Sequence, residues 1–169
     1  SYTQSIRTSI QRYSRTRLLV DIANAIGACV VAGNVRRSSE IMIGSPVDNI
    51  FLDLKNYVLN PERQDIGWNS NNSIRLEKSH HFEWMSVIAE KIRQNGEPGI
   101  LNLINIQKYG KFGKLWPDKA TLINPCGELP LENKETCCLS EVFPTRCNSD
   151  DEFIKAAEYA TFYASTVVL

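Results

Sequence analysis

The sequence of 169 residues lacks the features that mark several broad classes of protein. No run of apolar residues reaches the roughly 18 that a membrane-spanning helix needs. The first residues do not follow the basic-then-apolar order of a signal peptide. Basic and acidic side chains number 19 each, so no net charge favours general binding to nucleic acids or to membrane surfaces. We therefore expect a cytoplasmic protein whose partners include neither nucleic acid nor a membrane.

The spacing Cys-x-x-Cys is also absent, although the sequence contains five cysteines. Thioredoxin-type sites and zinc knuckles both depend on that spacing, so neither is favoured. Four of the cysteines nonetheless fall in one stretch, at Cys126, Cys137, Cys138 and Cys147. In a protein that is not exported, such thiols are more often free, metal-binding or redox-active than paired in structural disulfides.

What is present is an ordinary globular composition, 43% hydrophobic and 22% charged, with enough residues for one sizeable core. Residues 16–31 are densely apolar and predict a mostly buried helix, in which Cys29 is a core thiol. Residues 39–44 predict a buried strand. Ser45 followed by Pro46 predicts the start of a helix that extends to about Asn56.

Four further elements are predicted in chain order: a strand over 73–76, a helix between Ser79 and Gly96, a strand over 100–103 and a helix that begins at Ser149. Ser149 and Glu152 form a capping box for the last helix. Its packed side is expected to contain Phe153, Ala157, Ala160 and Ala164. Because strands alternate with helices, the sequence predicts an α/β fold.

Both ends of the sequence resemble cuts through a larger domain. The chain opens at Ser1 without an initiator methionine, and it closes on an apolar run over 164–169. No glycine, asparagine or basic turn stops the predicted helix there. We therefore expect residues 1–169 to be one partial domain that is truncated at both ends.

The segment Asn124-Pro125-Cys126-Gly127-Glu128 places an amide, a thiol and a carboxyl group at alternate positions. If this segment is extended, the three side chains point the same way. A thiol beside an acid–base group and a neutral hydrogen-bonding group can form a reaction centre. The residues alone leave two other interpretations open, a small buried side chain and a zinc site formed with the later cysteines.

Two motifs resemble the catalytic subunit of ribonucleotide reductases, above all the adenosylcobalamin-dependent class. Asn-Pro-Cys-Gly-Glu, followed by Leu-Pro-Leu-Glu and by Cys-x-Leu-Ser-Glu-Val-Phe, is similar to the finger loop of these enzymes. The segment 33–41, Gly-Asn-Val-Arg-Arg-Ser-Ser-Glu-Ile, is similar to their specificity loop. Similar segments also occur between the two, at 51–56, 71–73 and 96–100. The resemblance implies part of a ten-stranded α/β barrel with a central finger loop that carries the radical cysteine.

The resemblance also implies a role for each residue of the finger loop. Cys126 matches the cysteine that becomes a thiyl radical and removes the hydrogen from C3′ of the ribose. Glu128 matches the general base for the 3′-hydroxyl proton, a role that suits a buried carboxylate, and Asn124 matches the amide that binds the ribose hydroxyls. Cys137 matches one of two thiols that reduce the substrate and end as a disulfide, the other being expected before Ser1.

The specificity loop and the cofactor follow from the same resemblance. Arg36 and Arg37, with Asn34 and Ser38, match a loop that senses a deoxynucleotide effector, and guanidinium groups suit phosphates and base edges. Adenosylcobalamin is the implied cofactor and supplies the radical. A ribonucleotide is the implied substrate, and a thioredoxin-like protein is the implied reductant. No metal ligands are expected.

The function implied is reduction of ribonucleoside triphosphates, or diphosphates, to 2′-deoxyribonucleotides for DNA synthesis. The segment alone is expected to be inactive. One alternative is the related class in which a second subunit with a di-metal cofactor generates the radical. The other is a non-catalytic, thiol-rich α/β module that binds nucleotides or zinc.

Overall fold

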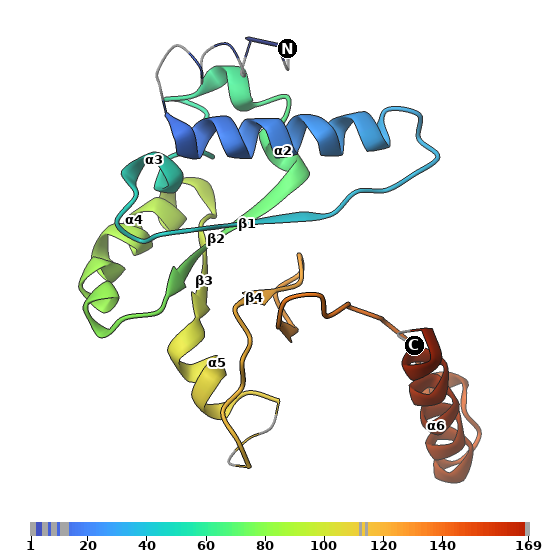
Figure 1. The fold of residues 1–169 in the computed structure, drawn as a ribbon. Coiled ribbons are helices and arrows are strands. Elements are labelled where there is room, and N and C mark those ends of the chain that lie inside the picture. Colours follow the sequence, from blue (N-terminus) through green and yellow to red (C-terminus); the bar gives the residue numbers. More distant parts are fainter. Residues whose placement is uncertain are drawn as a thin grey trace. The chain divides into compact units, whose positions relative to one another are not determined.

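The chain divides into two compact units, Ser1–Asn133 and Lys134–Leu169. The computed structural model describes residues 3–4, 7, 10, 14–111, 113 and 115–167, drawn as a ribbon in Figure 1. Helices of the first unit include α2 (Arg15–Val31), α3 (Asn49–Leu52), α4 (Met85–Asn95) and α5 (Leu103–Tyr109). Its strands are β1 (Glu40–Gly44), β2 (Ser70–Leu76), β3 (Gly99–Asn102), β4 (Leu122–Ile123) and β5 (Pro130–Leu131). Short 3₁₀ helices lie at Pro61–Arg63, Gly67–Asn69 and Ser79–Trp84.

A parallel sheet of order β1–β2–β3 is the main sheet of the first unit. Glu40 pairs with Ser70, and Ser73 pairs with Gly99, so β2 is the middle strand. Parallel neighbours need a crossover connection, and here α3 lies in the first crossover and α4 in the second. The predicted α/β class is confirmed, while the ten-stranded barrel stays a prediction because the described residues contain three parallel strands.

The hydrophobic core joins one face of β2 to helices α2, α3 and α4. Ile74 and Leu76 are two residues apart in β2 and therefore lie on the same face of the sheet. They are buried together with Val20, Phe51, Leu52, Leu54 and Ile88. Ile88 belongs to the predicted helix between Ser79 and Gly96, which is confirmed as a 3₁₀ turn that continues into α4. Gly96 ends this helix with φ 77°, the left-handed conformation expected of a C-terminal glycine.

Helix α2 buries polar side chains and exposes apolar ones. Its buried positions include Arg17, Asp21 and Asn24, whereas Leu19 and Ile26 are each 60% exposed. The helix itself was predicted within one residue, but the prediction that it is mostly buried is wrong. Apolar periodicity indicates which face of a helix avoids water, and in this chain a different face contacts the rest of the unit.

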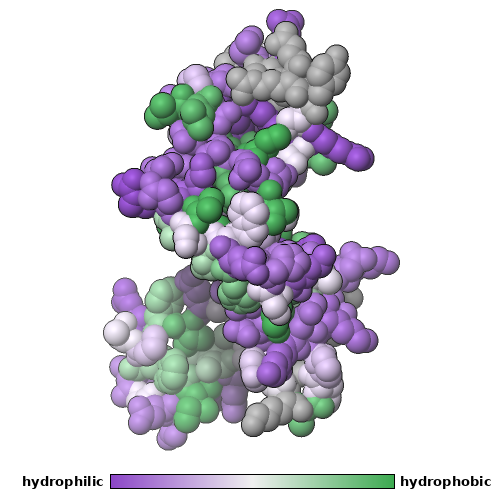
Figure 2. All heavy atoms as spheres, turned by 90° about the vertical axis from the view of Figure 1, so that its left-hand side faces the viewer, coloured by the Kyte–Doolittle hydropathy of each residue, from purple (hydrophilic) through white to green (hydrophobic). Residues whose placement is uncertain are grey.

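The outer face of α2 also carries Cys29. This thiol is exposed and lies beside Ile22, Ile26 and Val30 in a shallow depression. The prediction that Cys29 is a core thiol is therefore wrong. Apolar side chains reach the surface elsewhere too, and Figure 2 shows them among polar side chains on the face that it draws.

The inner face of α2 is held by a buried group of polar side chains, Arg17, Asp21, Asn24 and Arg63, which we call the Asp21 network. Asp21 is fully buried and accepts hydrogen bonds from Arg63 Nε at 2.7 Å and from Arg17 Nε at 3.4 Å. Arg63 donates further to the carbonyl oxygen of Leu54 and, at 3.0 Å, to Asn24 Oδ1. Each of the three nitrogens of its guanidinium group thereby donates a hydrogen bond.

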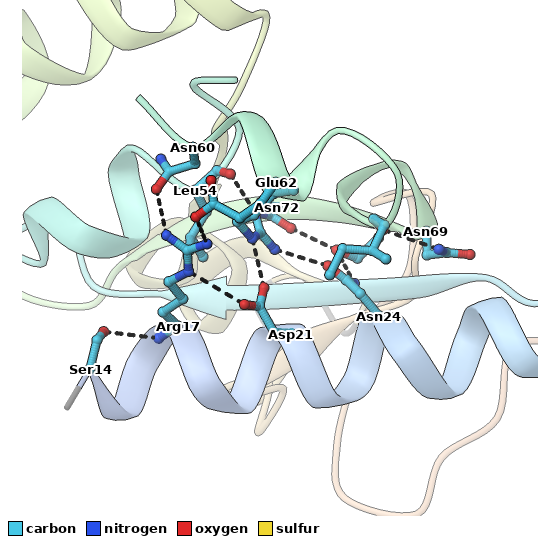
Figure 3. Close-up of polar contacts among 12 residues, drawn as sticks. Ser14, Arg17, Asp21, Asn24, Leu54, Asn60, Glu62, Asn69 and Asn72 are labelled. Atoms are coloured by element: carbon cyan, nitrogen blue, oxygen red, sulfur yellow. Dashed lines mark hydrogen bonds and ion pairs between the residues drawn. The ribbon is translucent and has the colours of Figure 1, made fainter. Parts of the chain in front are cut away.

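Arg17 connects the same network to the segment before Arg63. Its Nη1 donates to Asn60 Oδ1 at 2.7 Å, and its Nη2 pairs with Glu62. Figure 3 shows Arg17, Asp21 and Asn24 extending from one side of α2 toward this segment. The network thus fixes α2 against the crossover between β1 and β2.

The helix predicted to have Ser45 as its N-cap begins three residues later. Asp48 is its N-cap, and Asp48 Oδ1 accepts from the backbone N–H groups of Ile50 at 3.0 Å and Phe51 at 3.1 Å. The helix ends at Leu52, so the predicted cap and the predicted length are wrong. Serine and aspartate are both good capping residues, and Ser45 instead accepts the backbone hydrogen bond of a turn that ends at Asp48.

The boundaries of the other predicted elements follow the predictions with one exception. Strands β1 and β3 lie within one residue of their predicted ranges, although β1 is only partly buried. Strand β2 begins at Ser70, three residues before the predicted start. Helix α5 was not predicted, and it is capped by Asn102, whose Oδ1 accepts from the Asn105 N–H at 3.1 Å.

The second unit consists of the segment after Asn133, a 3₁₀ turn at Pro144–Arg146 and helix α6 (Asp150–Val167). The predicted helix start is confirmed, since Ser149 Oγ accepts from the Glu152 N–H at 3.2 Å. No described residue of α6 is fully buried, so the predicted packed side stays a prediction; its Ala157, Ala160 and Ala164 are half-buried, whereas Phe153 is exposed. The predicted apolar continuation at residues 168 and 169 lies outside the described residues.

Asp21→Asn should destabilise the chain strongly. The substitution removes the carboxylate charge opposite the buried Arg63, and breaking a buried ion pair in this way costs about 3–5 kcal/mol. Urea denaturation would measure the free energy of unfolding. Arg93→Ala removes a partner from the exposed Glu90–Arg93 pair and is the control, with little change expected. An unchanged midpoint for Asp21→Asn would show that the network does not hold α2.

Candidate functional site

The segment 124–128 is the loop of a short β-hairpin. Strands β4 and β5 are antiparallel, with Leu122 paired to Leu131 and Ile123 paired to Pro130. Beyond the last strand pair, the Asn124 N–H donates to the Leu129 carbonyl oxygen at 3.2 Å. The loop is therefore closed at its base by backbone hydrogen bonds.

Asn124 stabilises this loop through hydrogen bonds of its side chain and its backbone. Its side chain is buried, and its Oδ1 accepts from the Leu129 N–H at 2.9 Å. Its carbonyl oxygen accepts from the Gly127 N–H at 2.9 Å, which closes a four-residue turn with Pro125 and Cys126 in the central positions. Gly127 follows with φ 89°, a conformation that glycine adopts without strain.

The turn exposes the thiol and the carboxylate. Cys126 and Glu128 are both exposed, whereas Asn124 is buried. The segment is therefore a turn, so the condition under which its three side chains would point the same way is not met, and Glu128 is exposed in this chain. Pro125 fixes the backbone in a conformation that suits the second position of a turn, and this local preference outweighs extended alternation.

The hairpin is attached to the parallel sheet at two points along β2. Asn71 Nδ2 donates to the Pro125 carbonyl oxygen at 2.7 Å, and Arg75 Nη1 donates to the Thr121 carbonyl oxygen at 3.5 Å. Asn71 and Arg75 are four residues apart in a strand and so lie on the same face of β2. Sequence reasoning did not assign a role to Asn71, although a run of polar residues in a middle strand was a usable signal.

The remaining predicted redox residue lies in the second unit. Cys137 and its neighbour Cys138 are each half-buried in the segment that precedes the 3₁₀ turn. Cys147, for which no role was predicted, donates from Sγ to the Phe143 carbonyl oxygen at 3.7 Å.

The predicted effector residues lie in the loop 33–39 between α2 and β1. Arg36 and Arg37 are exposed, and Ser38 is half-buried. Asn34 has φ 55°, and its N–H donates to the Val31 carbonyl oxygen at 3.0 Å, which closes a turn just after the C-cap residue Ala32. The loop therefore presents both guanidinium groups to solvent.

Glu40 holds the end of this loop against α2. The helix approaches Glu40 at Gly27, where an added Cβ would collide with the Glu40 carboxylate and lie 3.3 Å from Ser38 Oγ. Glu40 Oε2 accepts from Asn24 Nδ2 at 3.2 Å. The first residue of β1 is thus joined to the Asp21 network.

Comparison with curated proteins found relatives that match most of this chain. The chain is 42% identical over 155 residues to a "Probable adenosylcobalamin-dependent ribonucleoside-triphosphate reductase" of Dictyostelium discoideum. It is 44% and 40% identical to proteins named adenosylcobalamin-dependent ribonucleoside-triphosphate reductase in Euglena gracilis and Lactobacillus leichmannii. The three matches cover 89%, 89% and 83% of this chain. The chain is homologous to an internal segment of these reductases.

This segment spans about one fifth of the reductases that it matches, with coverage of 20% to 21% of their length. No protein-family model and no solved structure matches the chain. Within the described ranges, no group of three histidine, cysteine or acidic side chains could hold a metal ion. The same residues include no helix of the length and apolarity needed to cross a membrane.

Gly27→Ala should destabilise this chain, although alanine in a helix is ordinarily favoured over glycine by about 1 kcal/mol. The added methyl group displaces the Glu40 carboxylate, and overpacking of this kind costs about 1–3 kcal/mol. Urea denaturation would measure the free energy of unfolding of each variant and of the unsubstituted chain. Gly33→Ala is the control, since a Cβ there meets nothing within 4 Å. Equal or greater stability of Gly27→Ala would contradict the contact between Glu40 and α2.

Gly127→Ala should also lower stability, but for a backbone reason. The nearest atom to an added Cβ is Ile123 Cδ1 at 3.8 Å, so no collision occurs. The left-handed conformation at φ 89° costs an alanine roughly 1–2 kcal/mol. Gly127→Asn should lose less, because asparagine tolerates positive φ better. The ranking of the three unfolding free energies checks this, and alanine equal to glycine would contradict the turn geometry.

Proposed function

We propose that this chain is the part of an adenosylcobalamin-dependent ribonucleoside-triphosphate reductase that carries the radical cysteine, Cys126. The observation that carries the proposal is the exposed Cys126 thiol at the tip of a rigidly closed turn, in a chain homologous to such reductases. A ribonucleoside triphosphate is the proposed substrate, and the product is a 2′-deoxyribonucleotide for DNA synthesis. We call the complete polypeptide that contains this segment the parent reductase.

Cys126 is the hydrogen-atom carrier in this proposal. Its S–H hydrogen atom would pass to the radical that the coenzyme supplies, and the resulting sulfur radical would remove the hydrogen atom from C3′ of the ribose. The same hydrogen atom returns to C3′ at the end, which restores the sulfur radical. A residue with this task must present its sulfur to the substrate, and the turn at Asn124–Gly127 achieves that by excluding Cys126 from the packed interior.

Glu128 and Asn124 assist at the ribose hydroxyl groups. Glu128 takes the proton of the 3′-hydroxyl group as general base, and its exposed carboxylate leaves it free to approach a substrate. Asn124 binds the ribose hydroxyls through its amide. Since Asn124 Oδ1 already accepts from Leu129, its role includes holding the turn in shape for Cys126 and Glu128.

Cys137 supplies reducing equivalents together with a second thiol. The two thiols lose two electrons and two protons and become a disulfide, while the 2′-hydroxyl group leaves as water and C2′ gains a hydrogen. A thioredoxin-like protein then reduces the disulfide by thiol exchange. Cys137 is half-buried in the second unit, an exposure compatible with exchange.

The residues around Cys126 fit a large coenzyme. Gly127 has no side chain, and both it and Cys126 are exposed, so the thiol can be approached from outside the turn. Adenosylcobalamin, when bound, supplies the radical that removes the hydrogen atom from a thiol. Cys126 and Gly127 are the residues of this chain that would face it.

The fold and the effector loop complete the proposal. The three parallel strands β1, β2 and β3 form part of a ten-stranded α/β barrel, and the β4–β5 hairpin is its finger loop. The exposed Arg36 and Arg37, with Asn34 and Ser38, bind a deoxynucleotide effector and change which base is accepted. The hydrogen bond between Glu40 and Asn24 of α2 connects this loop to the rest of the unit.

Cys126→Ser should abolish ribonucleotide reduction by the parent reductase. A hydroxyl group holds its hydrogen atom too strongly to replace the thiol as a hydrogen-atom carrier. The measurement is conversion of a labelled ribonucleoside triphosphate to its 2′-deoxy product, with and without adenosylcobalamin. Cys147→Ser is the matched control and should retain activity.

Three outcomes would contradict the proposal. Undiminished reduction by Cys126→Ser would remove the radical role from this residue. Reduction that needs a second subunit and no adenosylcobalamin would move the parent to the di-metal class. Reduction by the 169-residue chain alone would contradict its being a segment that is inactive by itself.

A further inference from the structure

Asn71 joins the parallel sheet to the turn that carries Cys126. Its Nδ2 donates to the carbonyl oxygen of Pro125 at 2.7 Å, across 54 positions of sequence. That carbonyl group belongs to the peptide unit that ends at the nitrogen of Cys126. The contact therefore acts on the peptide plane from which the Cys126 side chain projects.

The geometry of a proline explains why this contact matters. The ring fixes φ of Pro125, so ψ of Pro125 is the torsion that still rotates the following peptide plane. The Gly127 N–H already holds the far side of the turn through the Asn124 carbonyl oxygen at 2.9 Å. With the Pro125 carbonyl oxygen bound to Asn71, both sides of the Cys126 residue are held.

The backbone of Asn71 is itself well anchored in β2. Both neighbours are buried, and Ser70 Oγ donates to Asn72 Oδ1 at 2.9 Å. Asn24 Nδ2 donates to Ser70 Oγ at 2.9 Å, and Lys55 Nζ donates to the Ser70 carbonyl oxygen at 2.6 Å. Asn71 thus extends toward the turn from a strand that the Asp21 network fixes on its other face.

The chemistry of the amide also suits a site that needs a protonated thiol. A lysine or arginine could donate the same hydrogen bond, but its positive charge near the sulfur would favour the thiolate. A thiolate has no hydrogen atom to give up. Asparagine donates without changing the charge beside Cys126.

We propose that Asn71 is a positioning residue for Cys126: its amide orients the Pro125–Cys126 peptide and so sets the direction of the thiol. This inference rests on the radical role proposed above for Cys126. Asn71 is not itself a reacting group, so its loss should slow the chemical step while leaving substrate binding in place.

The first test uses the 169-residue chain and needs no catalytic activity. Hydrogen exchange at the Gly127 amide, followed by NMR, reports how often the turn opens. Asn71→Ala should speed this exchange roughly threefold to tenfold, as expected for the loss of one hydrogen bond. Exchange at the Ala28 amide in α2 should not change. Asn71→Asp, which cannot donate when ionised, should behave like Asn71→Ala.

The second test uses the parent reductase with adenosylcobalamin. Asn71→Ala should lower kcat at least tenfold and change KM less than twofold. Asn71→Gln keeps the donor on a longer side chain and should recover a substantial part of kcat. Asn49→Ala, which alters an exposed asparagine at the start of α3, is the matched control and should equal wild type.

The outcomes separate the two proposals. Unchanged Gly127 exchange in Asn71→Ala, or an unchanged kcat, would overturn the positioning role. A parent reductase in which wild type forms no deoxynucleotide would overturn the proposed function instead, and Gly127 exchange would still decide whether Asn71 holds the turn.

Discussion

The buried ion pair between Asp21 and Arg63 is the constraint on which the rest of the first unit depends. Two charged groups removed from water are tolerated only where they are hydrogen-bonded, and here each guanidinium nitrogen of Arg63 donates, to Asp21, Asn24 or the Leu54 carbonyl oxygen. This requirement dictates which face of α2 turns inward. It also leaves the apolar face of α2 exposed in this chain. The need to hydrogen-bond the buried polar side chains explains this orientation of the helix, whereas the spacing of its apolar residues does not.

The same network reaches both candidate functional loops through Asn24. One amide of Asn24 donates to Glu40, at the end of the proposed effector loop, and to Ser70, at the start of β2. The next residue, Asn71, holds the turn that presents Cys126. The proposed effector loop and the Cys126 turn are therefore attached to the adjacent strands β1 and β2, whose first residues, Glu40 and Ser70, both accept from Asn24.

Sequence patterns predicted features that depend on neighbouring residues correctly, but they mispredicted burial that depends on contacts between distant segments. Gly96 and Ser149 marked helix ends correctly because capping depends on a few neighbouring atoms. The burial of α2 could not be inferred, since its partner Arg63 lies 42 residues from Asp21. The motif around Cys126 predicts a chemistry only through its resemblance to a family, and its alternating residues would share one side only if the segment were extended. Pro125 and Gly127 form a turn instead, and Asn71 holds it from a distant strand.

The central claim is that Cys126 carries an unpaired electron during turnover. Electron paramagnetic resonance of the freeze-quenched parent reductase, with adenosylcobalamin and substrate, tests it most directly. A radical on the Cys126 sulfur couples to the hydrogens on its β-carbon, so the account predicts a signal that narrows when cysteine is deuterated there. The signal should be absent in Cys126→Ala. The same signal in Cys126→Ala, or a line shape unaffected by deuteration, would contradict the claim.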